Sequence, residues 1–150
     1  MAQPEVRRFL RALVAPAELD DVTQDTFVRA YRSLPRFRAE STGRTWLLTI
    51  ARHAAADATR RQIRMRRAQE RANDIAPVRA TPNTDDAYAL RELVAALEPE
   101  RQEAFVLTQM VGCSYAEAAE ICGVPVGTIR SRVARARDQL LEQVLAARSA

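Results

Sequence analysis

Apolar side chains recur at intervals of three and four residues along most of the chain, and this spacing limits the fold more than any other feature. It places one apolar stripe on a helix, whereas a half-buried strand alternates every second residue. Nothing alternates with period two for long enough to form a strand. The sequence therefore predicts an all-α protein, and its clearest stripe consists of Leu19, Val22, Thr26, Phe27, Ala30, Tyr31 and Leu34.

Turn-forming residues divide these helical patterns into two portions. Pro35 ends the first long helix, and Ser41 or Thr42 is suited to cap a second helix that starts near residue 43. Residues 72–86 contain two prolines and no apolar period, which favours a linker. We predict two small helical domains, 1–71 and 87–150, joined by a flexible linker at 72–86.

Arginines accumulate at the end of the second long helix. Eight of them lie between Arg44 and Arg71, against only Asp57 and Glu70, and the apolar stripe fades beyond Ala58. A helix end without an apolar stripe leaves the core, so it needs another reason to exist. The chain has 23 basic residues, all of them arginine, and 19 acidic ones. Arginine suits recognition of phosphate and guanine, although a preference for arginine codons would give the same composition.

The strongest local motif runs from Ser114 to Arg137. Ser114 followed by Glu117 predicts a capping box, Gly123 ends the helix, and Pro125 opens the next one, so the pattern is that of a helix-turn-helix. Val126, Ile129, Val133, Leu140 and Val144 fall in one sector of the second helix. The opposite sector carries small, hydroxyl and arginine side chains and has no acid before Asp138. Such a face can enter a major groove, although a solvated basic helix would show the same pattern.

Composition and the termini exclude several classes of protein. No apolar run is long enough to span a membrane, and the first residues show no signal-peptide pattern, so we expect a soluble, cytoplasmic protein. Cys113 and Cys122 fall at apolar positions of a helical pattern and lack the spacing of a metal site, so we expect buried thiols. The sequence predicts no cofactor and no bound metal.

Three blocks of sequence together resemble the bacterial extracytoplasmic-function (ECF) sigma factors of RNA polymerase. The first block is DDVTQDTFVRAY at 20–31, and the second runs from RFR at 36–38 to RTWLLTIAR at 44–52. The third joins SYAEAA at 114–119 to VGTIRSRVARAR at 126–137. The resemblance covers nearly the whole chain, and the blocks stand in the order found in that family. It implies a transcription initiation factor that carries out no chemistry of its own.

The resemblance also implies a role for each block. Asp21, Gln24 and Asp25 match positions that contact core RNA polymerase. The second block matches the part that opens and holds the promoter's minus-ten element, which implies contacts by Phe37, Arg38, Ser41, Thr42, Arg44, Arg52, Arg60 and Arg61. The third block matches the reader of the minus-35 element, with Thr128, Arg130, Ser131, Arg132 and Arg135 facing DNA. His53 stands where the family commonly has asparagine, and an anti-sigma factor is a further partner implied by the family.

Two alternatives remain from the residues themselves. A stand-alone helix-turn-helix regulator would use the last portion only and would leave the first seventy residues without a role. A metal-dependent nucleic-acid-processing enzyme would use Asp20, Asp21 and Asp25, of which the last two lie one turn apart on one helix face. The sequence offers neither a third ligand at that spacing nor a glycine-rich phosphate loop.

Overall fold

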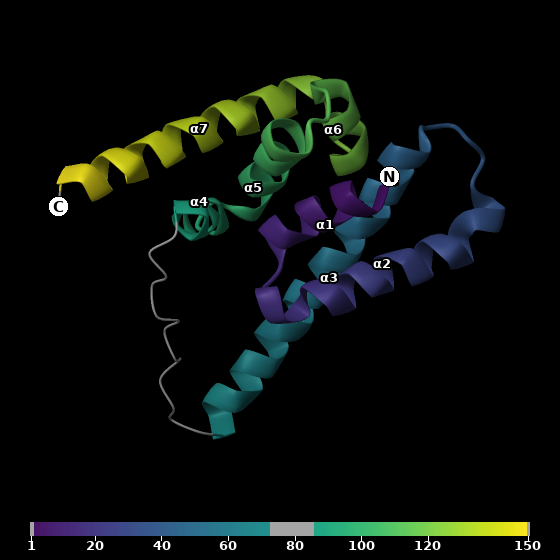
Figure 1. Ribbon diagram of the computed structural model, residues 1–150, viewed down its shortest axis with the longest axis horizontal. Helices are drawn as coiled ribbons and strands as arrows, with labels where there is room; N and C mark the ends of the chain where they lie inside the picture. The colour runs from purple at the N-terminus through teal and green to yellow at the C-terminus, as the bar shows by residue number, and fades with distance from the viewer. Residues whose placement is uncertain (1, 73–85, 150) are drawn as a thin grey trace.

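The computed structural model describes residues 2–72 and 86–149, and the described residues form helices and turns without any strand (Figure 1). The prediction of an all-α fold is therefore confirmed. The first portion contains α1 (Ala2–Leu13), α2 (Leu19–Ser33) and α3 (Gly43–Ala72), and single 3₁₀ turns at Pro16–Glu18 and Leu34–Arg36 flank α2. Helices α1 and α2 both pack on α3. Most of the predicted linker, residues 73–85, lies outside the described residues.

The second portion contains α4 (Asp86–Ala95), α5 (Pro99–Phe105), α6 (Tyr115–Cys122) and α7 (Val126–Ser149). Helix α5 continues without a break into Val106–Val111, which has the wider π-helical winding. Gly112 ends it at a φ of 89°, a left-handed conformation that suits glycine. Helix α7 packs on α5 and on α6, so the helix-turn-helix predicted from the sequence is present.

Local capping explains where the helices of the second and third sequence blocks begin. The backbone N–H of Thr45 donates to Thr42 Oγ1 at 3.1 Å, so Thr42 caps α3. At α6, Glu117 N–H donates to Ser114 Oγ and Ser114 N–H donates to Glu117 Oε1, both at 3.0 Å, which completes the predicted capping box. Gly123 closes α6 in the left-handed region, with φ at 68°.

The two portions pack against each other. Helix α1 lies against the π-helical segment Val106–Val111, and α3 lies against α6. Gln102 of α5 donates a hydrogen bond to the carbonyl oxygen of Ala12 at 3.0 Å. Buried apolar side chains of both portions, such as Phe9 of α1 and Leu107 of the π-helical segment, belong to one continuous core. The two portions are therefore held together by contacts between residues that lie far apart in the sequence.

Three apolar residues were placed in the core wrongly by periodicity. Tyr31, near the end of α2, is 79% exposed, and Leu34, in the 3₁₀ turn that follows, is 54% exposed. Val144 of α7 is 40% exposed. In each case the periodic stripe continues beyond the residues that another helix covers, and the period alone does not reveal where that cover ends.

Candidate nucleic-acid interface

The N-terminal half of α7 separates an apolar inner face from a polar outer one. Ile129, Val133 and Ala136 are fully buried against α5 and α6. Arg130, Ser131 and Arg135 are exposed, and Thr128 is half-buried beside the turn, where its N–H donates to the Pro125 carbonyl at 3.0 Å. The outer face therefore presents guanidinium groups and a hydroxyl to solvent, on a helix preceded by a tight turn.

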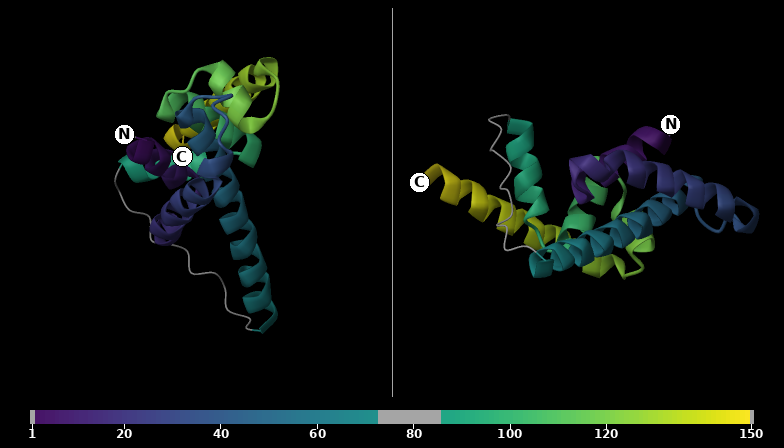
Figure 2. Two further views of the ribbon diagram at one scale, coloured as in Figure 1. Left: turned by 90° about the vertical axis from the view of Figure 1, so that its right-hand side faces the viewer. Right: turned by 90° about the horizontal axis from the view of Figure 1, so that it is seen from below.

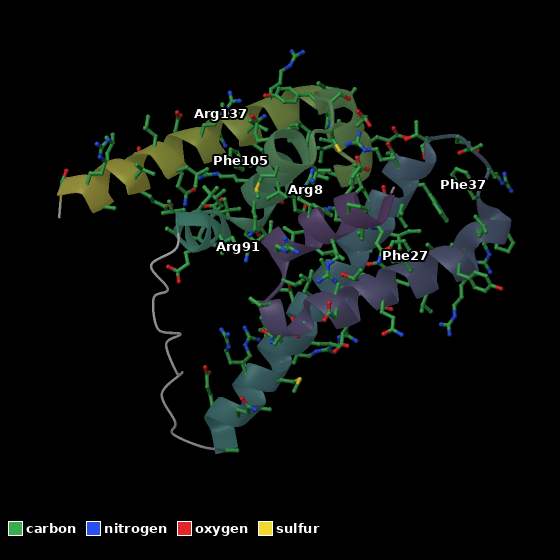
Figure 3. All side chains as sticks on the ribbon, viewed as in Figure 1. Arg8, Phe27, Phe37, Arg91, Phe105 and Arg137 are labelled. Carbon is green, nitrogen blue, oxygen red and sulfur yellow. The ribbon has the colours of Figure 1, made fainter. Side chains whose placement is uncertain are left out.

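Two arginines near this face already contact side chains of the same portion. Arg132 lies 3.4 Å from Glu100 Oε2, and its side chain is only 19% exposed. Arg137, labelled in Figure 3, donates to Gln109 Oε1 at 2.8 Å while remaining exposed. Arg132 thus serves the contact between α7 and α5, whereas Arg130 and Arg135 have no ion pair among the described residues. Arg130 and Arg135 are therefore more available than Arg132 for contact with another molecule.

The loop between α2 and α3 combines one anchored aromatic ring with exposed polar groups. Phe37 is half-buried and packs on Trp46, with ring centroids 4.8 Å apart (Figure 3). Arg38 is exposed and Ser41 half-buried, while the hydroxyl of Thr42 is occupied in capping α3. Ala39 has a φ of 56°, which is unfavourable for a residue with a Cβ atom. The loop is therefore anchored at both ends, by Phe37 on Trp46 and by Thr42 at the start of α3.

Arg44, at the start of α3, bridges the two portions of the protein. Its Nε donates to Glu5 at 2.9 Å, while its terminal nitrogens donate to Glu117 at 3.1 Å and to the Val111 carbonyl at 3.3 Å. The hydrogen bond to Glu5 is the main cause that raises the pKa of Arg44. To bind a DNA phosphate, the Arg44 guanidinium would have to give up its hydrogen bonds to Glu5 and Glu117.

Arg52, two turns further along α3, makes the second ion pair between the portions. Its Nε donates to Glu103 Oε2 at 2.9 Å, and the two side chains are 28% and 16% exposed. Burial acts to lower the pKa of Arg52, but the hydrogen bond and charge of Glu103 outweigh it, so the pKa is raised. His53, the next residue, is exposed. In this arrangement, Arg52 faces the second portion of the chain.

Beyond the contact with α6, the basic groups of α3 face solvent. Arg60 pairs with Asp57, which also accepts from Arg29 of α2 at 2.9 Å. The hydrogen bond from Arg29 is the main cause that lowers the pKa of Asp57. Arg61 is exposed without an ion pair among the described residues. Arg64, Arg67 and Arg71 are exposed as well, and their spacing at three and four residues in the sequence indicates that they share one face of the helix.

The three residues assigned to polymerase contact differ in availability. Asp21 and Gln24 are exposed on α2, whereas Asp25 is half-buried and pairs with Arg29 at 3.0 Å. Asp20 pairs with Arg7 of α1 at 2.8 Å. Two of the three carboxylates required by the metal-enzyme alternative are thus neutralised by arginine. In the described parts of the chain no three metal-ligating side chains come together.

The two cysteines are buried, as the apolar pattern predicts. Burial raises the pKa of the Cys113 and Cys122 thiols to about 11. Both are therefore protonated at neutral pH and behave as small apolar side chains. Across residues 2–72 and 86–149, no helix has the length and apolar character required to cross a membrane.

Known proteins match both portions of the chain. Family models for Sigma-70 region 2 and Sigma-70 region 4 match residues 1–65 and 87–140. The probable RNA polymerase sigma-C factor of Mycobacterium bovis is 46% identical over 142 residues, which cover 93% of this chain and 77% of that protein. The sigma factor CarQ of Myxococcus xanthus is 34% identical over 143 residues, covering 93% and 82%.

Two solved structures share the fold over most of their length. The sigma factor RpoE of Bartonella quintana, in complex with the anti-sigma factor NepR, superposes with a TM-score of 0.80 at 31% identity, covering 95% of this chain and 91% of that one. CnrH, in complex with the cytosolic domain of CnrY, gives a TM-score of 0.69 at 28% identity, covering 97% and 81%. Together with the helix-turn-helix and the basic faces described above, these matches show that the chain belongs to the ECF family of bacterial RNA polymerase sigma factors.

Proposed function

We propose that residues 1–71 bind core RNA polymerase and the minus-ten element, and that residues 87–150 read the minus-35 element. The observation that carries this proposal is the outer face of α7, where Arg130, Ser131 and Arg135 are exposed on the second helix of a helix-turn-helix. The first turns of such a helix contact base edges, and arginine binds guanine or phosphate there. Acting on DNA together with polymerase places the protein in the cytoplasm.

Promoter opening in this proposal uses binding energy and breaks no covalent bond. Extruding a base from the duplex costs a few kcal/mol, and the loop 37–42 together with the arginines of α3 would recover it by holding the open strand. An equilibrium shifts by the difference in affinity for its two states, so the protein favours the open form as far as it binds that form better. No catalytic residue is needed, and we propose that the chain is not an enzyme.

The minus-35 assignment is tested with substitutions on α7. Arg130→Ala or Arg135→Ala should cost about 1–3 kcal/mol of binding to the upstream element if the side chain reads a base, or lower the salt slope by about one if it meets a phosphate. Arg148→Ala removes the same charge near the end of α7 and is the matched control. The promoter fragment would come from in-vitro transcription with core polymerase on a promoter pool. Unchanged affinity in both variants contradicts the assignment.

The polymerase contact is tested on the exposed part of α2. Asp21→Ala combined with Gln24→Ala should weaken retention of core polymerase, because both side chains face solvent. Glu120→Ala, on the exposed side of α6, is the control. The stand-alone regulator alternative predicts no retention by the unchanged protein and binding to its DNA site without polymerase.

An anti-sigma factor is the second partner that we propose. The relatives RpoE and CnrH are described in complex with NepR and with the cytosolic domain of CnrY. In this chain a groove of about 810 Å³ runs between α1, α3, α4 and α5, with mainly apolar walls and with Arg11, Arg91, Glu92 and Glu103 among its lining residues. An apolar helix that carries an acidic side chain opposite Arg11 or Arg91 would fit it. An inhibitor that binds there should lose potency against Arg11→Glu or Arg91→Glu, and not against Arg148→Glu.

A further inference from the structure

Four side chains of alternating charge lie in a row across the contact between α2 and α3, two helices that pack against each other (Figure 1 and Figure 2). Asp25 and Arg29 belong to α2, and Asp57 and Arg60 belong to α3. Each of them forms an ion pair with the next. We call these four residues the charged row. It connects a residue proposed for polymerase contact with a residue proposed for the minus-ten element.

Arg29, in the middle of the charged row, divides its guanidinium between two carboxylates. Its Nη2 lies 3.0 Å from Asp25 Oδ2, and its Nη1 lies 2.9 Å from Asp57 Oδ2. Burial acts to lower the pKa of Arg29, but the hydrogen bonds to Asp57 and Asp25 outweigh it, so the pKa is raised. An arginine fork can also bind one carboxylate through two parallel hydrogen bonds, which is the stronger arrangement. Arg29 does not use that arrangement here, because its two terminal nitrogens serve different partners.

Asp57 is divided in the same way between two arginines. Its Oδ2 accepts from Arg29 of α2, whereas its Oδ1 accepts from Arg60, one turn further along α3. The hydrogen bond from Arg29 is the main cause that lowers the pKa of Asp57, ahead of the bond from Arg60. Arg60 is 66% exposed, and such an ion pair is worth only about two- to fivefold in an equilibrium constant. Arg60 is therefore the partner that Asp57 loses more easily.

The arrangement makes the availability of Arg60 depend on what Asp25 contacts. A cationic group of a partner that binds Asp25 removes that carboxylate from Nη2 of Arg29. The freed nitrogen can turn to Asp57 Oδ1 and complete a fork of two hydrogen bonds with this carboxylate. Arg60 then loses its acceptor and becomes available to a phosphate. We propose that Asp57 is a positioning residue that couples polymerase contact at Asp25 to DNA contact at Arg60.

The coupling acts in both directions, because a free energy of coupling between two sites is reciprocal. A phosphate that binds Arg60 leaves Asp57 to Arg29, and Arg29 in turn gives up Asp25 to polymerase. In the free chain Asp57 holds Arg60 back from DNA, and in the holoenzyme it does not. This inference rests on the function proposed above, since it uses the polymerase and minus-ten assignments made there, and adds a physical link between them.

The first test measures DNA binding by the full chain without polymerase. Asp57→Asn keeps the size of the side chain but removes the charge that holds Arg60. The variant should bind a promoter fragment about two- to fivefold more tightly than wild type in fluorescence anisotropy at about 50 mM salt. Glu70→Gln removes the same charge from α3 and is the control, since Glu70 is exposed and has no ion pair within residues 2–72 and 86–149. Its gain should be smaller.

Double variants separate the release of Arg60 from a simple loss of negative charge. Asp57→Asn should give no gain in an Arg60→Gln background, whereas a general electrostatic effect would persist there. Asp25→Asn imitates the loss of Asp25 to polymerase, so by itself it should also raise the DNA affinity of the free chain. Combined with Asp57→Asn it should add nothing. A merely structural role of Asp57 predicts weaker binding in every background, together with lower helical circular dichroism.

The same variants are then compared in the holoenzyme. Arg60→Gln should weaken promoter binding there, because the arginine has been released to DNA. Asp57→Asn should change promoter affinity less in the holoenzyme than in the free chain, since polymerase has already taken Asp25. If Asp57→Asn proves misfolded by circular dichroism, the gain of Asp25→Asn and its loss in the Arg60→Gln background still decide the question.

The outcomes distinguish this inference from the proposed function. If neither Asp25→Asn nor Asp57→Asn binds DNA more tightly than the wild-type free chain, or if the gains persist without Arg60, the coupling is overturned and the proposed function stands. A gain by Glu70→Gln equal to that of Asp57→Asn overturns it as well. Unchanged promoter binding by the Arg60→Gln holoenzyme would overturn the minus-ten assignment of Arg60 in the proposed function and, with it, the inference.

Discussion

Replacing Glu103 by glutamine tests how strongly the two portions of the protein hold each other. The substitution keeps the shape of the side chain but removes the charge that faces Arg52 at 2.9 Å. Fully buried pairs lose about 3–5 kcal/mol when one partner is removed, and exposed pairs about 0–1 kcal/mol. With 28% and 16% of the two side chains exposed, this pair lies between these limits. We expect the free energy of unfolding to fall by about 2 kcal/mol, the middle of the range for hydrogen bonds to charged groups.

Urea denaturation followed by circular dichroism measures this loss, and the chain offers a matched control. Glu98 lies 3.6 Å from Arg101 and is 70% exposed, so Glu98→Gln should cost about 0.5 kcal/mol or less. A double-mutant cycle that adds Arg52→Met isolates the pairwise energy from other effects of the substitution. A coupling energy below about 0.5 kcal/mol, or equal losses for Glu98→Gln and Glu103→Gln, would refute the view that Arg52 and Glu103 stabilise the contact.

Three further predictions concern local groups. The Ser114 backbone hydrogen bond is the main cause that lowers the pKa of Glu117 from its ordinary 4.5, so the stability it contributes is complete above that pH and is lost as the pH falls through the lower folded value. Denaturation curves of Glu117→Gln should therefore depend less on pH between 5 and 3, and an unchanged dependence would contradict this. Ala39→Gly should stabilise the protein by about 0.5–1 kcal/mol in thermal unfolding, because the strain at φ 56° exceeds the entropy that glycine loses, whereas a lower melting temperature would show that the loop is unstrained. With pKa values near 11, Cys113 and Cys122 should resist alkylation at pH 8 in the folded protein and react quickly in urea; fast native modification would show that burial does not protect them.

Features that depend on neighbouring residues could be predicted from the sequence. The capping box at Ser114 and Glu117, the left-handed Gly123 and the cap at Thr42 each need only a few residues at fixed spacing. The helix-turn-helix follows from them. The same local logic placed Arg130 and Arg135 on the outer face of α7, where both are exposed.

Features that depend on distant residues could not be predicted. Arg44 contacts Glu117, 73 positions away, and Arg52 contacts Glu103, 51 positions away. In the sequence, Arg44 and Arg52 are candidates for DNA contact because they are basic. The residues near them in the sequence do not reveal that another portion of the chain supplies a carboxylate to each. Tyr31 was misplaced for a related reason, since its exposure depends on how far α3 and its loop extend along α2.

Glu117 shows how the contact between the portions can break without disturbing the helix-turn-helix. One carboxylate oxygen, Oε1, accepts from the Ser114 N–H at 3.0 Å and belongs to the cap of α6. The other, Oε2, accepts from Arg44 at 3.1 Å and belongs to the contact with α3. If Arg44 transfers to a phosphate, only the second bond is lost, and Oε2, already partly exposed, can be hydrated. The helix-turn-helix therefore keeps both bonds of its capping box, while the guanidinium that binds it to the first portion becomes available to the promoter.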